Sequence, residues 1–253
     1  MADDRPIFVA GAGSWGTALA VLIANQGYRT ILWGRREEHA RALNEERENR
    51  RYLPGVDLPP PLEATTDLSR VSSAQAVVFV VPAQHSRGVL IELRNAADRA
   101  PMPVVLCSKG LERGTLAPMH HVLEEAWPEA EPAVLSGPSF AADVARGLPT
   151  AVTLAASSPE AQQFWLERLA TSSFRPYASD DLMGAELGGA VKNVLAIACG
   201  IAVGKGFGES AKAALIARGF SEFQRFGRVM GARHETMGGL SGLGDLVLTA
   251  NSK

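Results

Sequence analysis

The stretch that decides the fold of this chain is Ile7-Phe8-Val9-Ala10-Gly11-Ala12-Gly13-Ser14-Trp15-Gly16. Its first four residues are apolar and β-prone, and residues 17–26 carry apolar side chains at helical spacing. A strand, a G-x-G-x-x-G loop and a helix in this order are typical of a dinucleotide-binding unit. Gly11 permits the tight turn, Gly13 lets the backbone approach a pyrophosphate, and Gly16 lets the helix pack on the strand. The alternative is a glycine turn without a ligand, which the flanking strand and helix disfavour.

The end of the next expected strand bears on which dinucleotide is bound. An NAD-binding unit carries an Asp or Glu there, roughly 20 residues after the glycines, to hold the ribose 2′-hydroxyl. Here residues 30–33 are followed by Gly34, Arg35 and Arg36. Guanidinium groups can fork onto a 2′-phosphate, so we predict that NADPH is preferred to NADH, with Arg35 and Arg36 as contacts. Alternatively, the two arginines only begin a solvated charged helix.

Composition excludes several classes of function. The chain has 253 residues, of which 46% are hydrophobic and 21% charged, as in a globular protein of one large or two modest domains. A net charge of −2 and a pI near 6.2 give no electrostatic case for a nucleic-acid partner. No metal site is expected, because no zinc-ligand spacing relates the five histidines, His39, His85, His120, His121 and His234.

The sequence also predicts a cytoplasmic protein without a membrane span. The two cysteines, Cys107 and Cys199, are too few for a disulfide framework, which favours a reducing compartment. Residues 1–6 lead directly into the first strand and leave no room for a signal peptide. The stretch 187–203 is almost wholly apolar, but it is short and interrupted by Lys192 and Asn193. We interpret it as the core helix of a soluble domain.

The order of the expected elements predicts two domains. Apolar β-type runs alternate with helical stretches up to about residue 180, which is typical of a doubly wound, Rossmann-like α/β domain. From there on the residues indicate helices only. We therefore expect a dinucleotide-binding domain over 1–180 and an all-helical substrate domain over 181–253. The chain stops in a polar stretch about 70 residues into that second domain, so we expect the second domain to be incomplete.

Candidate reactive groups follow the carboxyl ends of the strands, where open α/β sheets bind ligands. Lys109 comes directly after an apolar strand and before a glycine, which favours a functional lysine over a surface one. The run from Ser136 to Phe140 offers hydroxyls and backbone amides at a helix start. Such a run suits an anion or a carbonyl group, although a plain helix cap would look similar.

Lys192 gives a sharper signal. It is the only ionisable residue between Leu187 and Val203, and its helical face-mates include Gly188 and Gly189. Small neighbours leave space for a ligand, and a lysine is almost never buried without a partner. We predict catalysis or ligand binding. The alternatives are an ion pair with Glu186 or Asp245, or a side chain that extends outward to water.

Asp245 is the candidate carboxylate. It follows Gly242-Leu243-Gly244, and glycines suit close approach, although Asp245 could simply cap a helix.

Together, these motifs resemble the bacterial-type NAD(P)-dependent glycerol-3-phosphate dehydrogenases. The blocks that carry the resemblance, in the order of that family, are residues 11–19, 80–82, 108–112, 136–141, 188–194 and 242–249.

The resemblance implies reversible reduction of dihydroxyacetone phosphate to sn-glycerol 3-phosphate, the backbone for phospholipid synthesis, by a homodimer. It implies that NADPH contacts Ser14, Trp15, Arg35, Lys109 and Ala141. It implies that substrate contacts Lys109, Gly137 and Ser139, and that Lys192 is the proton donor or acceptor, with Asp245 beside it and Asn193 and Thr249 nearby. The chain departs from the family in lacking an Arg-Asn pair soon after Thr249, which helps hold the phosphate, and a later Glu that helps hold the cofactor.

The chemistry is consistent with these residues. Hydride transfer to a ketone carbon puts charge on the oxygen, which two nearby cations stabilise and one protonates. Each ammonium group lowers the pKa of the other, while a carboxylate opposes that effect. Two other classes remain as alternatives. One is a hydroxyisobutyrate-type or hydroxyacyl-CoA dehydrogenase, and the other is a non-catalytic NADPH-binding module.

Overall fold

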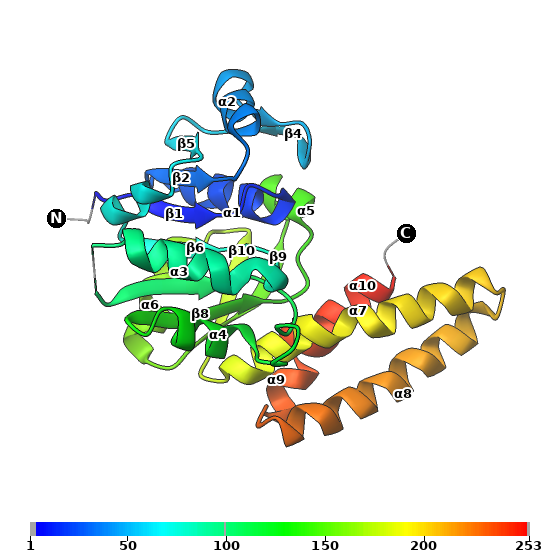
Figure 1. Cartoon of the computed structure of the whole chain (residues 1–253). Coiled ribbons are helices and arrows are strands. Elements are labelled where there is room, and N and C mark those ends of the chain that lie inside the picture. The colour runs from blue at the N-terminus through cyan, green and yellow to red at the C-terminus, as the bar shows by residue number, and fades with distance from the viewer. Residues whose placement is uncertain (1–3, 99, 252–253) are drawn as a thin grey trace.

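The computed structural model describes residues 4–98 and 100–251, so part of the predicted approach to the first strand lies outside it. An α/β domain leads into a set of helices that extends away from it (Figure 1). The domain is built on one eight-stranded sheet in the order β10-β9-β8-β7-β6-β1-β2-β5. Its strands are β1 (Ile7–Ala10), β2 (Thr30–Trp33), β5 (Leu62–Thr65), β6 (Ala76–Phe79), β7 (Met102–Leu106), β8 (Ala130–Ser136), β9 (Thr150–Ala156) and β10 (Phe174–Ser179).

The sheet confirms the predicted fold class, with one change of direction. Strands β5, β2, β1, β6, β7 and β8 run parallel to one another. Strand β9 is antiparallel to β8, and β10 is parallel to β9. The connecting helices are α1 (Ser14–Ala24), α2 (Glu37–Glu46), α3 (Ser86–Ala96), α4 (Met119–Ala126), α5 (Ala141–Ala145) and α6 (Pro159–Leu169).

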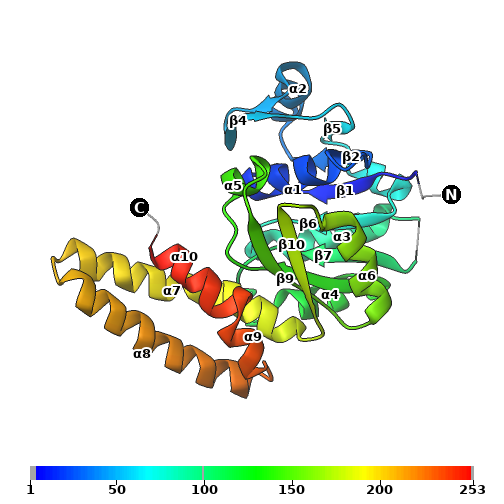
Figure 2. The same cartoon turned by 180° about the vertical axis from the view of Figure 1, so that it is seen from behind.

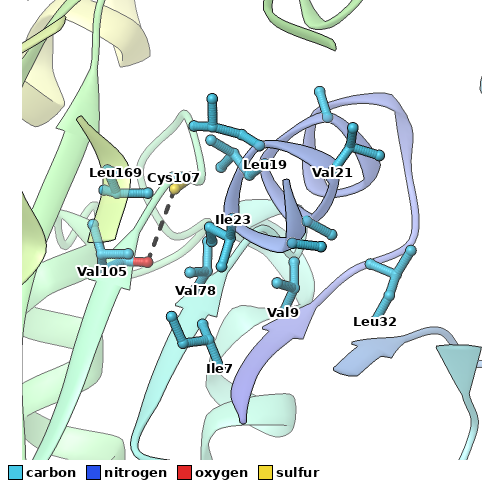
Figure 3. Close-up of a cluster of buried hydrophobic side chains, with 14 of the residues drawn as sticks. Ile7, Val9, Leu19, Val21, Ile23, Leu32, Val78, Val105, Cys107 and Leu169 are labelled. Atoms are coloured by element: carbon cyan, nitrogen blue, oxygen red, sulfur yellow. Dashed lines mark hydrogen bonds between the residues drawn. The ribbon is translucent and has the colours of Figure 1, made fainter. Parts of the chain in front are cut away.

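Two apolar layers hold the sheet between helices. Alternate strand residues point to opposite faces of a sheet, so Val9 lies in one layer and Phe8 in the other. Figure 3 shows the first layer, where Leu19 and Ile23 of α1 lie over β1 and β6. On the other face, α3 and α4 bury leucines and valines against the same strands. Burial on both faces explains why the β6 sequence is a continuous apolar run.

The chain order creates a crevice between two halves of the sheet. From β1 the chain builds outward through β2 and β5, then returns to place β6 on the other side of β1. At such a switch point, the loops after neighbouring strands diverge and leave room for a ligand at their carboxyl ends. The glycine-rich loop after β1 lies at this point.

The charged helix that follows Arg36 is short. Helix α2 ends at Glu46 because Arg47 takes the left-handed conformation, with φ +54°. Its guanidinium donates to the carbonyls of Leu58, Pro59 and Leu62 at 2.6–3.1 Å. The chain then forms a small hairpin of β3 (Glu48–Asn49) and β4 (Leu53–Asp57).

The remaining helices form an antiparallel hairpin and a short return. Helix α7 (Leu182–Gly204) begins three residues after β10 ends, and α8 (Gly208–Val229) runs back along it (Figures 1 and 2). Helix α9 (His234–Gly238) and a π-turn (Leu240–Gly244) then lead into α10 (Asp245–Ala250), which packs beside α7.

Only part of α7 is a core helix, contrary to the prediction. Residues 184–189 are buried, but Val194 and Ile197 are 65% and 64% exposed. Among the described residues, α7 is the one helix whose length and apolar composition would suffice to cross a membrane. Its first half is instead taken up by contact with the α/β domain, and its second half projects with α8 (Figure 2).

Candidate active site

The glycine-rich loop has the geometry of a dinucleotide cradle. Gly11 has φ +124°, and a Cβ there would lie 2.8 Å from the carbonyl oxygen of Val80, so only glycine fits. Gly13 precedes α1 without any side-chain cap, and nothing lies within 4 Å of where its Cβ would be. The first N–H groups of α1 are therefore not taken by a capping side chain, and they can receive an anion.

A cavity of about 300 Å³ lies beside this loop at the switch point. No carboxylate is among the described residues that line it. Arg35 and Arg36 lie exposed at its edge. The lining therefore offers positive charge and no negative charge to an anionic dinucleotide. The lining residues include Gly11, Ala12, Gly13, Trp33, Gly34, Arg35, Arg36, His39, Tyr52, Val80, Val81, Pro82 and His85.

No motif in the sequence placed His39 and Tyr52 at this cavity. The Ser14 hydroxyl donates to the Tyr52 carbonyl at 2.5 Å and so joins the β3–β4 hairpin to the glycine loop. His39 lies 3.1 Å from the Asn49 amide oxygen and edge-on to the Tyr52 ring. The two residues come together because the hairpin packs against α2, which carries His39, as well as against α1.

Other predicted cofactor contacts lie around the cavity rather than on its wall. Ser14, Trp15 and Gly16 form the first turn of α1, and Trp15 is half-buried against the core. Ala141 begins α5, which packs beside α1. Lys109 lies in the loop between β7 and α4, at the same edge of the sheet.

The predicted catalytic residues meet at one carboxylate. Asp245, the first residue of α10, accepts from Lys192 Nζ on Oδ1 at 2.5 Å and from Lys109 Nζ on Oδ2. The Asp245 side chain is 1% exposed, that of Lys192 11% and that of Lys109 26%. The ion pair weighed as an alternative for Lys192 is thus present, and its partner is Asp245 rather than Glu186.

Two glycines of α7 allow this approach, and they correct one interpretation. A Cβ on Gly188 would lie 1.9 Å from the Ser241 carbonyl oxygen, and one on Gly189 would lie 3.1 Å from Lys109 Cγ. The small residues were expected to leave space for a ligand beside Lys192. That space is instead filled by the turn before α10 and by the Lys109 side chain.

Electrostatics make Lys192 a candidate proton carrier. Burial disfavours its ammonium form, and the charge of Lys109 adds to that effect, while Asp245 opposes both. The net result lowers the pKa of Lys192 to about 8. A lysine with such a pKa can give and take a proton near neutral pH.

Ser136, at the end of β8, was not singled out as a contact in its own right. It is buried, and its hydroxyl has no hydrogen-bond partner among the described residues. It lies on the Lys109 side of Gly189, because a Cβ at Gly189 would be 3.4 Å from Ser136 Oγ. An unpaired buried hydroxyl is costly, so this atom is placed to receive a polar group of a ligand or a water molecule.

The other predicted substrate contacts are Gly137, Ser139, Asn193 and Thr249, and two of their hydroxyls bond to backbone carbonyls. The Ser139 hydroxyl donates to the Gly137 carbonyl at 3.2 Å and caps no helix, since α5 begins only at Ala141. Thr249 lies one turn after Asp245 on α10, and its hydroxyl donates to the Asp245 carbonyl at 2.8 Å. Asn193 follows Lys192 on α7 and is exposed.

Metal and thiol chemistry find no support in the described part of the chain. It contains no group of three or more His, Cys, Asp or Glu that could hold a metal ion. Cys107 and Cys199 are both free and buried. Burial raises the pKa of Cys107 to about 12, so its thiol stays protonated.

Comparison with known proteins gives one consistent family. Residues 6–162 match the N-terminal family model of NAD-dependent glycerol-3-phosphate dehydrogenase, and residues 181–253 match its C-terminal model. The glycerol-3-phosphate dehydrogenase (NAD(P)+) of Parvibaculum lavamentivorans is 55% identical over 248 residues, which is 98% of this chain and 74% of that protein. The corresponding protein of Methylobacterium radiotolerans is 55% identical over 253 residues, which is 100% of this chain and 76% of that protein.

Solved structures agree. A crystal structure of glycerol-3-phosphate dehydrogenase from Coxiella burnetii is similar, with a TM-score of 0.95 and 41% identity, and covers 98% of this chain and 76% of that one. The chain thus spans about three quarters of these relatives. Models of both halves and identities above 50% confirm the predicted resemblance. The chain belongs to the NAD-dependent glycerol-3-phosphate dehydrogenase family.

Proposed function

We propose that this chain catalyses the reversible reduction of dihydroxyacetone phosphate to sn-glycerol 3-phosphate with NAD(P)H. The observation that carries the proposal is the pair of ammonium groups held on Asp245 beside a dinucleotide cradle. Ser108 joins the two sites, because its hydroxyl donates to the carbonyl of Val81 at 2.6 Å and Val81 lines the cavity. The family to which the chain belongs supports the same reaction.

The cradle is proposed to hold NADPH. Gly11, Gly13 and the first turn of α1 would take the pyrophosphate, and Arg35 and Arg36 would take the 2′-phosphate. When bound, the cofactor supplies the hydride. Ser14, Trp15, Gly16, Lys109 and Ala141 are the further proposed contacts.

The lysine cluster supplies the polar part of the chemistry. As the carbonyl carbon accepts hydride, negative charge grows on its oxygen, and two cations beside it stabilise that charge. Lys192 then donates a proton to the oxygen, and it takes the proton back in the oxidation direction. Lys109 remains charged beside it. Asp245 holds both ammonium groups in place, and the unpaired hydroxyl of Ser136 offers a further donor on the Lys109 side.

Substrate positioning is proposed for the backbone and hydroxyl groups around this cluster. Gly137 and Ser139 follow β8, at the same edge of the sheet as Lys109. Asn193 follows Lys192 on α7, and Thr249 lies one helical turn after Asp245 on α10. We assign these four residues, with both lysines and Asp245, to dihydroxyacetone phosphate.

The wider setting of the reaction is proposed as follows. Residues 1–180 bind the cofactor, and residues 181–253 complete the substrate site. The product enters phospholipid synthesis in the cytoplasm. The two free cysteines favour a reducing compartment. The first half of α7 is buried in protein and carries Lys192, which argues against its spanning a membrane.

Replacement of Lys192 tests the proposed reaction. Lys192→Ala removes the proton donor and one of the two cations, so kcat for NADPH oxidation with dihydroxyacetone phosphate should fall by about 10²–10⁴-fold. NADPH affinity, followed by nucleotide fluorescence, should stay within about twofold of the parent, because Lys192 does not line the cofactor cavity.

The matched control is Lys205→Ala, which removes an exposed lysine at the far end of the same helix. It should leave kcat unchanged. Equal rates in the parent and Lys192→Ala would remove Lys192 from the mechanism. A parent that binds NADPH without turnover would instead favour a non-catalytic binding module.

The pH dependence of turnover should follow Lys192. The reduction needs its ammonium form, so kcat for reduction should fall as pH rises through about 8. The oxidation needs the neutral amine, so its kcat should rise through the same pH. Rates in both directions between about pH 6 and about pH 10 measure this. If kcat rose with pH in both directions, or fell with pH in both directions, the assignment of Lys192 would be contradicted.

Cofactor preference should depend on the two arginines. Arg35→Ala combined with Arg36→Ala should weaken NADPH binding by about 10–100-fold, because charge-assisted hydrogen bonds to the 2′-phosphate are lost. NADH binding should change little. Arg41→Ala, an exposed arginine of α2 outside the cavity, is the control. An equal loss for both cofactors in the double variant would refute the proposed role.

The chain is also proposed to form a homodimer. The support is the exposed apolar surface of the α7–α8 hairpin, where Ile197 and Phe207 are 64% and 63% exposed. Sedimentation velocity of the intact chain at several concentrations should show a species of twice the chain mass. A monomer at every concentration would overturn this proposal.

A further inference from the structure

A buried ion pair joins the two structural elements that carry the lysines. The Glu186 carboxylate accepts from the backbone N–H of His120 at 2.9 Å on one oxygen and lies 2.8 Å from His120 Nδ1 on the other. The side chains are 4% and 8% exposed, respectively. A carboxylate that makes both contacts fixes the direction as well as the distance between its two elements.

The pair lies between the two elements that carry the lysines, the Lys109 loop and α7. His120 is the second residue of α4, where the loop carrying Lys109 ends. Glu186 lies on α7, six residues before Lys192 and so about 9 Å along the helix axis. The pair is therefore the buried polar contact between the end of the Lys109 loop and the helix of Lys192.

Other contacts fix the remaining parts of both elements. Ser108 ties the start of the Lys109 loop to Val81 in the segment after β6, and Gln84 donates to the Leu111 carbonyl at 2.8 Å near the middle of the loop. Asp181 caps α7 at Gly184 N and accepts from Arg233 N at 2.9 Å. None of these contacts joins the loop to α7. Leu111, in the middle of the loop, packs in the apolar cluster that contains Leu187 of α7. At the loop's far end, the His120–Glu186 pair adds a polar contact with α7.

The surroundings favour the charged form of the pair. Burial acts to lower the pKa of His120, but the hydrogen bond and charge of Glu186 outweigh it, with help from Glu124 and Asp181. The net pKa is raised. The ring of His121 lies against that of His120, with centroids 4.3 Å apart. These contacts favour the imidazolium form of His120 more than water would.

We propose that Glu186 and His120 are positioning residues, which align the Lys109 loop with α7 so that both ammonium groups meet on Asp245. Neither side chain takes part in the cluster of Lys109, Lys192 and Asp245. This inference rests on the proposed function only for its kinetic readout.

Loss of the alignment has a signature of its own. The charge of Lys109 is the second-largest of the effects that lower the pKa of Lys192, after burial. If the loop moves away from α7, that charge recedes, while Asp245 stays paired to Lys192 through the contact of α10 with α7. The pKa of Lys192 must then rise from about 8 towards its ordinary value. A loss of fold stability alone would not move it.

The experiment uses Glu186→Gln, His120→Ala and His120→Asn in the full chain. Glu186→Gln and His120→Ala should lower kcat by about 10–100-fold, because a misplacement of about 1 Å costs up to about that much. NADPH affinity should stay within about twofold of the parent. The fall in kcat for reduction with rising pH should occur at a higher pH than in the parent. His120→Asn retains an N–H donor near Nδ1 and should recover most of the loss.

A second readout needs no turnover. Trinitrobenzenesulfonate reacts with neutral amines, so the pH midpoint of Lys192 labelling, read by peptide mass spectrometry, reports its pKa. The midpoint should be about 8 in the parent and higher in Glu186→Gln and His120→Ala. Glu129→Gln breaks a surface ion pair with Arg94 and should shift nothing.

The outcomes separate the two proposals. An unchanged labelling midpoint in Glu186→Gln and His120→Ala overturns the positioning role, even if their thermal stability falls. A raised midpoint supports the role even where the parent has no turnover, in which case the proposed reaction alone fails. If Glu186→Gln does not fold, the comparison of His120→Ala with His120→Asn decides.

Discussion

The buried carboxylate of Asp245 is the interaction on which the site depends. Two ammonium groups from separate parts of the chain would repel each other if they were buried together without a counter-charge. A carboxylate that is 1% exposed, with one oxygen for each lysine, makes the arrangement stable and leaves a net positive charge. The helical part of the chain therefore completes a site that the α/β domain only begins, because α10 brings the carboxylate and α7 the second lysine.

The need to bring Asp245 to both lysines also explains how closely α10 and the turn before it pack on α7. For α10 to reach Lys192, the turn before it must pass over α7 at a distance that leaves no room for a side chain, which is why residue 188 is glycine. The cavity for the dinucleotide lies apart from this cluster but shares its sheet edge. Loops after β1 and β6 form the phosphate cradle, and the loop after β7 carries Lys109 to the proton carrier Lys192 on α7.

The sequence was informative where the signal was local. The order of strand, glycine loop and helix predicted the α/β domain, and Lys192 stood out as the one ionisable residue in an apolar helix. The ion pair of Lys192 with Asp245 was foreseen as an alternative. Other contacts between distant residues left no local signal. Lys109 and Asp245 are 136 positions apart, and His120 and Glu186 are 66 apart. The exposure of Ile197 was missed for a related reason, since an apolar helical run does not reveal which part of it is covered.

Helix α7 runs without a break for 23 residues, from the domain boundary past Lys192 to the tip of the hairpin. It is one continuous helix, and only its first half contacts the α/β domain. A tilt of about 5° about Glu186 would swing the backbone of Lys192 by about 0.8 Å, at 1.5 Å of rise per residue. Such a swing approaches the misplacement at which reaction geometry is lost. The leverage of the projecting hairpin on the active site is therefore built into the length of a single helix.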